Sequence, residues 1–314
     1  MTAPTMRTSD MTHDVWVVAT DPRRLASMAA AARGLGGRVT VVAIGERSVA
    51  EAAAASGADA VAWVETQART PAEAYAPALA RAVVEAAPRV VLAATTAEGR
   101  ALLGWAAAAL GASVVSGLTS VTADGDALLV ERVGLGGRVI ESFAVGAPLA
   151  GLFGGEDTPP PAGASAPIEP LALEPIDVRV EATVPVPGAT GGVSTADRVV
   201  AIGRGLKAKG DLAIIESLAA ALGAEIACSM PIADDFGWVA KERYVGRSGQ
   251  QIAPRLYLAI GISGMPQHLE GVRDAKVVVG INTDPGARIF ERAAYGIVGD
   301  LYEVVPALQH ALGK

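Results

Sequence analysis

The feature that most constrains the fold is an alternation of short β-prone runs with longer alanine-rich segments. From residue 14 onward, apolar runs rich in valine occur at Val15–Ala19, Val39–Ile44, Ala60–Val64 and Val90–Ala94. The alanine-rich segments between them have high helix propensity and are about Pro22–Arg33, Val49–Ser56 and Pro71–Ala87. Strands that alternate with helices form parallel sheets covered by helices, so we expect an α/β domain in this part of the chain.

The pattern changes between residues 100 and 153. The segment Ala101–Ala123 carries no charge, but glycines interrupt it and its alanine-rich composition is only weakly hydrophobic. We therefore expect a buried helix followed by a strand there, rather than a membrane span. A turn sequence at Ala123–Asp126 and β-prone runs at Val139–Val145 and Ala147–Phe153 follow. These runs predict a smaller, partly antiparallel extension of the sheet.

Proline and glycine dominate the next part of the chain. Thr158–Pro170 is expected to be an exposed extended loop, and Ile176–Val184 is interpreted as one more strand. Proline and glycine cluster again at Pro185–Gly192, a composition typical of linkers. We therefore expect an N-terminal α/β domain at residues 1–190 and a C-terminal domain at residues 191–314. Met1–Thr12 lacks an apolar stretch of signal-peptide length and is interpreted as a loose tail.

A second alternating series begins at Arg198. Its expected strands are about Arg198–Ile202, Glu225–Ala227, Leu256–Ile260, Lys276–Ile281 and Gly296–Val298. Its expected helices are near Asp211–Leu222, Met265–Gly271, Ala287–Ala294 and Leu301–Leu312. The predicted fold class is therefore α/β with two domains, each a mostly parallel sheet flanked by helices.

Composition and motifs exclude several classes of protein. With 51% apolar and 19% charged residues, the chain can build sizeable cores, and its net charge of −7 disfavours nucleic acid as a partner. Cys228 is the only cysteine, so no intrachain disulfide can form and a reducing, cytoplasmic compartment is expected. The three histidines, His13, His268 and His310, show no metal-ligand spacing. No hydrolase or Walker motif occurs either, so we expect a bound cofactor to carry out any redox chemistry.

The residues with the clearest chemistry lie between Val245 and His268. Two glycine-serine loops, Gly246–Gly249 and Gly261–Gly264, flank the apolar run Leu256–Ile260. Glycine lets a turn after a strand approach a ligand closely, and the N–H groups at a following helix start suit a phosphate or an electron-rich ring edge. A nucleotide site is one interpretation of these residues. A tight loop that binds nothing is as consistent with them when they are taken alone.

The sequence around these loops is more specific. The pattern VGxSGxxxxPxLYxAxGISGxxQH from Val245, followed by Asn282–Pro285 and Tyr295–Leu301, closely resembles the α subunit of electron-transfer flavoproteins. The resemblance extends from Val199 to Val305 in the family's order and spacing. It implies that the C-terminal domain is a doubly wound, FAD-binding domain. It also implies an electron carrier that transforms no organic substrate of its own.

The same resemblance implies the partners. A β subunit would complete a heterodimer, and the N-terminal domain would serve subunit and partner binding. Flavin dehydrogenases would donate electrons, and a quinone oxidoreductase or a similar acceptor would receive them. Neither nucleic-acid binding nor embedding in a membrane is expected. Two alternatives stay open: a related nucleotide-binding α/β domain of a thiamine- or NAD-dependent enzyme, and a scaffold without a cofactor.

The resemblance further assigns FAD contacts to individual residues. Arg204 would contact the pyrophosphate, while Ser263 and Asn282 would lie in the phosphate and ribityl region. Ser248 would face the N5 and O4 edge of the flavin ring, and His268 its N1 and C2=O edge. From the residue types alone, Arg204 also fits a solvated loop arginine and His268 a core residue. The other expected cofactor-binding residues are Ser229, Met230, Val245, Gly246, Arg247, Gly261, Gly264, Gln267, Asp300 and Leu301.

One position departs from the family's pattern. Within Cys228–Pro231 the family typically has an arginine beside the flavin ring, where this chain has Met230. Methionine offers an apolar, polarizable contact, so we expect a lower first reduction potential of FAD than is usual in the family. Arg247 would partly substitute if its side chain turned toward the ring, although a solvated arginine is the simpler interpretation.

The resemblance also implies that Asp300 would contact the adenosine, and its position also fits a helix N-cap.

Overall fold

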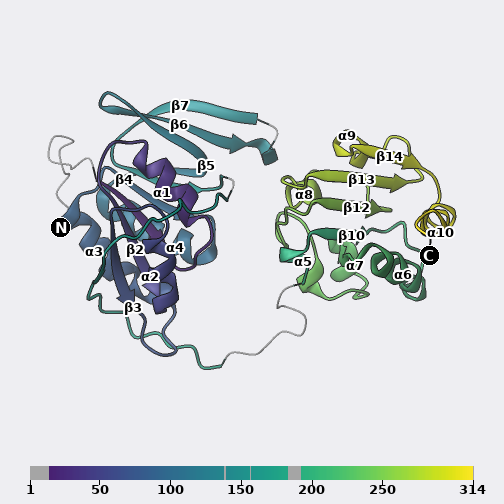
Figure 1. Ribbon diagram of the computed structural model, residues 1–314, viewed down its shortest axis with the longest axis horizontal. Helices are drawn as coiled ribbons and strands as arrows, with labels where there is room; N and C mark the ends of the chain where they lie inside the picture. The colour runs from purple at the N-terminus through teal and green to yellow at the C-terminus, as the bar shows by residue number, and fades with distance from the viewer. Residues whose placement is uncertain (1–13, 138, 156, 183–191, 314) are drawn as a thin grey trace. The chain divides into compact units, whose positions relative to one another are not determined.

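The computed structural model describes residues 14–137, 139–155, 157–182 and 192–313 (Figure 1). The chain divides into two compact units, Met1–Thr183 and Val184–Lys314. The tail expected at residues 1–12 and the proline-glycine run before Gly192 lie outside the described residues. Among the helices that the structure describes, none is both long and apolar enough to cross a membrane.

The N-terminal unit is built on one nine-stranded sheet. Its strand order is β7-β6-β5-β8-β4-β1-β2-β3-β9, and all pairings are parallel except β5 with β6 and β6 with β7. The expected antiparallel extension is therefore present. The strands are β1 (Val15–Ala19), β2 (Val39–Gly45), β3 (Ala60–Glu65), β4 (Val90–Ala94), β5 (Ser113–Asp124), β6 (Ala127–Gly134), β7 (Val139–Gly146), β8 (Leu149–Phe153) and β9 (Ile168–Pro170).

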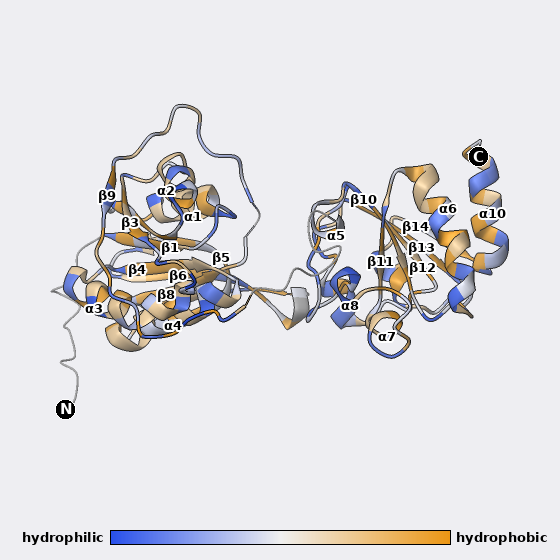
Figure 2. Cartoon of the chain, turned by 90° about the horizontal axis from the view of Figure 1, so that it is seen from below, coloured by the Kyte–Doolittle hydropathy of each residue, from blue (hydrophilic) through white to orange (hydrophobic). Residues whose placement is uncertain are grey.

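Helices cover both faces of this sheet (Figure 2). Apolar residues of α1 (Leu25–Arg33) and α2 (Arg47–Ala54) pack with one set of strand side chains, including Val17, Val41 and Leu92. Residues of α3 (Ala76–Ala86) and α4 (Ala97–Leu110) pack with the opposite set. Strands buried on both faces carry nearly continuous apolar runs, which is why valine and alanine fill β1, β2 and β4.

One expectation in the proline-rich part is wrong, and another holds except at its last three residues. The described part of Ile176–Val184 forms no strand, because its main chain does not bond to another strand. The Ile176 amide donates to the carbonyl of Ala74 in a short 3-10 helix, and the Val180 amide donates to the carbonyl of Arg69 in the turn before it. The Thr158–Pro170 segment is mostly loop, but its last three residues form β9, which pairs with β3 at the edge of the sheet. Proline is tolerated there because an edge strand has one unpaired side.

The C-terminal unit is a doubly wound domain with a five-stranded, fully parallel sheet in the order β11-β10-β12-β13-β14. Two apolar clusters occupy its two faces, one involving α9 and the other α6 and α10. The predicted fold class is confirmed. The strands are β10 (Arg198–Ile202), β11 (Glu225–Cys228), β12 (Leu256–Ile260), β13 (Val277–Asn282) and β14 (Tyr295–Val298). The helices are α5 (Gly192–Thr195), α6 (Leu212–Leu222), α7 (Met230–Ala233), α8 (Pro266–Glu270), α9 (Ile289–Arg292) and α10 (Leu301–Ala311).

Candidate functional site

A cavity of about 650 Å³ lies at the carboxyl ends of the C-terminal strands. The chain leaves β10, forms β11 on one side of it, and then crosses to form β12 on the other side. Open parallel sheets bind ligands at such a topological switch point, where two connections leave in opposite directions and a crevice opens. The volume is in the range of small-molecule sites.

Most of the predicted cofactor-binding residues line this cavity. Twelve of the fifteen do so: Arg204, Ser229, Met230, Arg247, Ser248, Gly261, Ser263, Gln267, His268, Asn282, Asp300 and Leu301. They come together because each follows a parallel strand or belongs to a loop packed against one. The site prediction did not include ten further lining residues, which are Gly203, Gly205, Lys207, Pro231, Tyr244, Ile262, Met265, Ile281, Thr283 and Gly299. Most of these are chain neighbours of predicted residues, so applying the strand-end rule to every neighbour would have found them.

The other three predicted residues do not line the cavity. Val245 is fully buried in the core below it. Gly246 packs against Gly271, where a Cβ atom would lie 2.4 Å from the Gly246 nitrogen. Gly264 has a φ of +78°, and a Cβ atom on it would lie 2.2 Å from the nitrogen of Ile289. These glycines serve the packing of the loops and are not in the cavity wall.

Close contact between two loops shapes the floor of the cavity. The amide of Gly205 donates to the carbonyl oxygen of Gly261 at 3.1 Å. A Cβ atom on Gly203 would lie 2.3 Å from the same oxygen, and one on Gly261, at φ +62°, would lie 2.7 Å from Gly205 Cα. Only residues without a side chain allow the loops after β10 and β12 to come this close.

Three basic side chains reach the cavity, and their partners differ. Lys207 Nζ lies 3.6 Å from a carboxylate oxygen of Asp300 and 4.7 Å from the ring centroid of Tyr302. Arg247 Nε lies 2.7 Å from a carboxylate oxygen of Glu270. Arg204 is exposed and has neither a hydrogen bond nor an ion pair with any residue in the described ranges. Its guanidinium is therefore available to an anionic ligand.

The loop after Tyr244 is fixed to α8. The Arg247 amide donates to the carbonyl of Gln267 at 2.7 Å, in addition to the ion pair of its side chain with Glu270. The hydroxyl groups of Tyr244 and Ser248 lie 3.2 Å apart. Arg247 is thus a partnered residue in the cavity wall, and its side chain is 56% exposed, which is consistent with the solvated arginine of the simpler interpretation.

His268 is buried beside Tyr257 at the wall of the cavity. The exposed fraction is 7% for His268 and 0% for Tyr257, and the tyrosine oxygen lies 2.7 Å from His268 Nε2. Burial lowers the pKa of His268 to about 4, and the main chain of Val245 acts in the opposite direction too weakly to offset it. The ring is therefore neutral at physiological pH.

Asn282 and Asp300 stabilise two of the loops that form the cavity wall. The amide nitrogen of Asn282 donates to the Ile262 carbonyl at 3.0 Å, and its side-chain oxygen accepts from the Asp284 amide. Asp300 accepts from the Tyr302 amide at 2.9 Å, so it caps α10 as its position suggested. Both polar groups are thus already engaged in fixing the loops after β13 and β14.

Two other candidate chemistries find no support. The described residues contain no cluster of His, Cys, Asp and Glu suited to a metal ion. Burial raises the pKa of the Cys228 thiol to about 12, and the side chain is fully buried, so it remains a protonated core residue.

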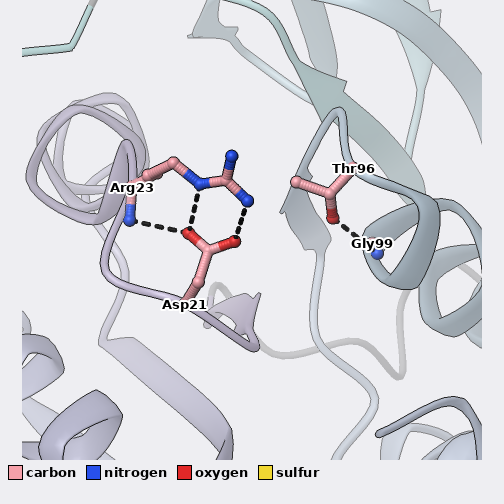
Figure 3. Close-up of polar contacts among 4 residues, drawn as sticks. All are labelled: Asp21, Arg23, Thr96 and Gly99. Atoms are coloured by element: carbon pink, nitrogen blue, oxygen red, sulfur yellow. Dashed lines mark hydrogen bonds and ion pairs between the residues drawn. The ribbon is translucent and has the colours of Figure 1, made fainter. Parts of the chain in front are cut away.

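The N-terminal sheet has a switch point too, between β1 and β4. There, Asp21 accepts hydrogen bonds from the main chain and the guanidinium of Arg23, at 2.7–3.1 Å (Figure 3). Thr96 Oγ1 accepts from the Gly99 amide at 3.0 Å and caps α4. The space left between these groups is only about 10 Å³, which is too small for a ligand.

Comparisons with known proteins agree with this architecture. A family model described as the electron transfer flavoprotein FAD-binding domain matches residues 192–273, and one described as the electron transfer flavoprotein domain matches residues 23–169. YdiR of Escherichia coli K12 is 34% identical over 309 residues, which are 96% of this chain and 99% of YdiR. FixB of Salmonella typhimurium is 32% identical over 312 residues, which are 96% of this chain and 98% of FixB.

A solved structure of a thiamin diphosphate-dependent enzyme from Mycobacterium smegmatis aligns with 95% of this chain and 60% of its own, at 12% identity. Its TM-score of 0.26 is too low to support any argument. The full-length relatives and the two matched domains support an assignment to a family. The chain belongs to the electron transfer flavoprotein family, as an α-type subunit with the family's FAD-binding domain.

Proposed function

We propose that this chain carries FAD in the cavity between β10 and β12 and passes electrons from flavin dehydrogenases to an acceptor such as a quinone oxidoreductase. In this proposal it acts as a heterodimer with a β subunit, in the cytoplasm, and converts no substrate of its own. The observation that carries the proposal is the convergence of twelve predicted cofactor-binding residues on one cavity at the switch point.

The residues present fit a flavin dinucleotide. A pyrophosphate requires close backbone approach and a cation. The cavity offers the Gly203–Gly261 contact and Arg204, which has no partner among the residues that the structure describes. A ring system requires apolar walls with a few polar groups, which Met230, Ile262 and His268 supply. When bound there, FAD would supply the redox chemistry that no side chain of this protein performs.

Each polar group has a separate task in this proposal. Arg204 balances negative charge near the phosphates. The loop held by Asn282 shapes the phosphate and ribityl region, and the loop held by Asp300 shapes the adenosine end. Arg247, which is paired with Glu270, lines the same cavity. His268 is neutral and largely shielded from water, so the protonation state of its ring does not change near neutral pH.

The N-terminal unit is assigned to subunit and partner binding. Between β1 and β4 the pair of Asp21 with Arg23 leaves about 10 Å³, which is too little space for a nucleotide at that point. The remaining surface, with the β5–β7 extension, is available for protein contacts. A division into domains near residues 185–192 would let the FAD-binding part move between partners.

Co-expression with a candidate β subunit tests the proposal. We expect a yellow complex with one copy of each chain, from which denaturation releases FAD. Limited proteolysis should cut between residues 183 and 192 or between 157 and 170. A colourless complex would contradict FAD binding, and a stable, fully FAD-loaded monomer of this chain alone would contradict the obligate heterodimer. Cleavage mainly inside residues 245–300 of the FAD-loaded protein would contradict the domain division.

A further inference from the structure

Tyr257 and His268 form a buried, hydrogen-bonded pair beside the cavity. Both side chains are buried, and Tyr257 is the second residue of β12, away from the carboxyl end of the strand, so its ring belongs to the core and does not line the cavity. The hydroxyl of Tyr257 lies 2.7 Å from His268 Nε2, and the two ring planes meet at 44°. His268 Nδ1 is buried and has no hydrogen-bond partner among the described residues.

The hydrogen-bonding capacity of the two groups decides which one donates. A tyrosine has one O–H donor, and a neutral imidazole has one N–H and one lone pair. If His268 Nε2–H donated to the tyrosine oxygen, the buried Tyr257 O–H and the Nδ1 lone pair would both lack a partner among the described residues. If the tyrosine donates to Nε2, only Nδ1–H lacks one. Because an unpaired buried polar group is costly, the second arrangement is favoured.

One further observation agrees with this arrangement. Burial raises the pKa of Tyr257, so its hydroxyl keeps the proton that it has to donate.

We propose that Tyr257 is a positioning residue that fixes the tautomer of His268. Its hydroxyl donates to Nε2, and the imidazole carries its single proton on Nδ1, which is buried. The consequence for FAD rests on the function proposed above, whereas the tautomer is a property of this chain alone. Because Tyr257 does not line the cavity, it influences a bound flavin only through His268.

The tautomer is measurable without a cofactor. In full-length chain labelled with ¹⁵N-histidine, long-range ¹H–¹⁵N spectra distinguish a proton on Nδ1 from one on Nε2, and the signals lost in His268→Gln identify this residue. We expect the Nδ1–H form in the wild type and a mixture of tautomers in Tyr257→Phe. Tyr295→Phe, a change on an exposed strand, serves as the control and should leave the His268 signals unchanged. A wild-type spectrum of the Nε2–H form overturns the proposal without need of any variant.

The role toward FAD has its own readout in the FAD-loaded complex. Tyr257→Phe should lower the flavin reduction potential while leaving the FAD content unchanged, and His268→Gln should lower it at least as much. Adding Tyr257→Phe to His268→Gln should produce no further shift, because the tyrosine acts through the histidine. An equal shift in both backgrounds overturns the positioning role. If the complex held no FAD, the proposed function would fail while the tautomer measurement would still decide the inference.

Discussion

The two sheets of this chain have the same kind of switch point but different contents. In the N-terminal sheet β1 lies between β4 and β2, and in the C-terminal sheet β10 lies between β11 and β12. Asp21 and Arg23 fill the first position and leave about 10 Å³, whereas glycines after β10 and β12 leave about 650 Å³ at the second. Topology therefore permits a site at both positions, and the residues that follow the strands decide whether one exists.

Charge separates the two positions further. A wider, open groove of about 560 Å³ beside the N-terminal position is lined by the carboxylates of Asp21, Glu46, Glu73 and Glu98, and its arginine, Arg23, is already paired. The C-terminal cavity contains a cation without a described partner, Arg204. An anionic dinucleotide is thus repelled from one position and attracted to the other.

The largest expected effect comes from placing the same small clash at each switch point. Gly203→Ala puts a Cβ atom 2.3 Å from the Gly261 oxygen, and Gly99→Ala puts one 2.2 Å from the Ala94 oxygen. Each change should destabilise its own domain by about 1–3 kcal/mol. Only Gly203→Ala should also yield a complex with little or no FAD, because only that clash separates the loops that form the cavity.

Denaturant unfolding and the flavin content per folded protein measure both effects. Gly210→Ala is the matched control, since a Cβ atom there has no neighbour within 4 Å. Equal loss of FAD from the Gly203 and Gly99 variants would show that the two switch points do not differ in the proposed way.

Acid should affect the two domains over different pH ranges. The folded-state pKa of His268 is about 4, below the unfolded value of about 6.5, so the unfolded chain binds a proton first as the pH falls. The stability that His268 contributes is complete above about pH 6.5 and is lost toward pH 4, by roughly 3 kcal/mol. Burial raises the pKa of Asp21, but the hydrogen bonds and the charge of Arg23 lower it by more, so the net shift is downward. The contribution of Asp21 to the stability of the N-terminal unit therefore persists as the pH falls below the usual aspartate range.

Hydrogen exchange at about pH 7 and about pH 5 distinguishes the two domains. Exchange through global unfolding should accelerate more in the C-terminal unit, after correction for the intrinsic pH dependence. His268→Gln should remove this difference, and His310→Gln, at the exposed end of α10, should not. An unchanged C-terminal stability between these two pH values would contradict the buried neutral histidine.

Removing one arginine from each switch point isolates the effect of charge. Arg204→Gln should weaken FAD binding about tenfold, because a charge-assisted hydrogen bond contributes about 1.5–3 kcal/mol and this side chain is partly screened by water. Arg23→Gln should leave FAD affinity unchanged. Titration of FAD into apo-protein measures both, and the Arg204 effect should shrink as salt increases. Similar affinities for wild type and Arg204→Gln would remove this residue from the site.

The sequence predicted the elements whose signals are local. The bounds of β1, β4, β10 and β12 agree with the predicted runs, because short apolar β-branched stretches end where polar residues or glycine begin. Most of the cavity wall was predictable as well, since the carboxyl ends of parallel strands meet at one edge of the sheet.

Features that depend on tertiary packing were not predictable in this way. Tyr257 lies in an apolar run and is indistinguishable from a core aromatic residue until α8 brings His268 to its hydroxyl. The ion pair of Arg247 with Glu270 joins the loop after Tyr244 to the end of α8. Ile176–Val184 has the composition of a strand but finds no strand to pair with in its described part.

The smallest expected effect concerns the position where this chain lacks the arginine that its family typically has beside the ring. Met230 is 45% exposed in the cavity wall, so a charge placed there is partly screened. Met230→Arg should raise the first reduction potential of bound FAD by roughly 10–40 mV, the equivalent of about 0.2–1 kcal/mol for one electron.

Arg247→Gln should lower this potential by a similar amount, because Glu270 holds the Arg247 guanidinium at the same cavity. Val298→Arg adds the same charge at a comparably exposed position outside the cavity and should change nothing. Reductive titration of the four proteins decides the matter, since equal potentials in wild type and Met230→Arg would show that Arg247 and His268 already make the missing guanidinium unnecessary.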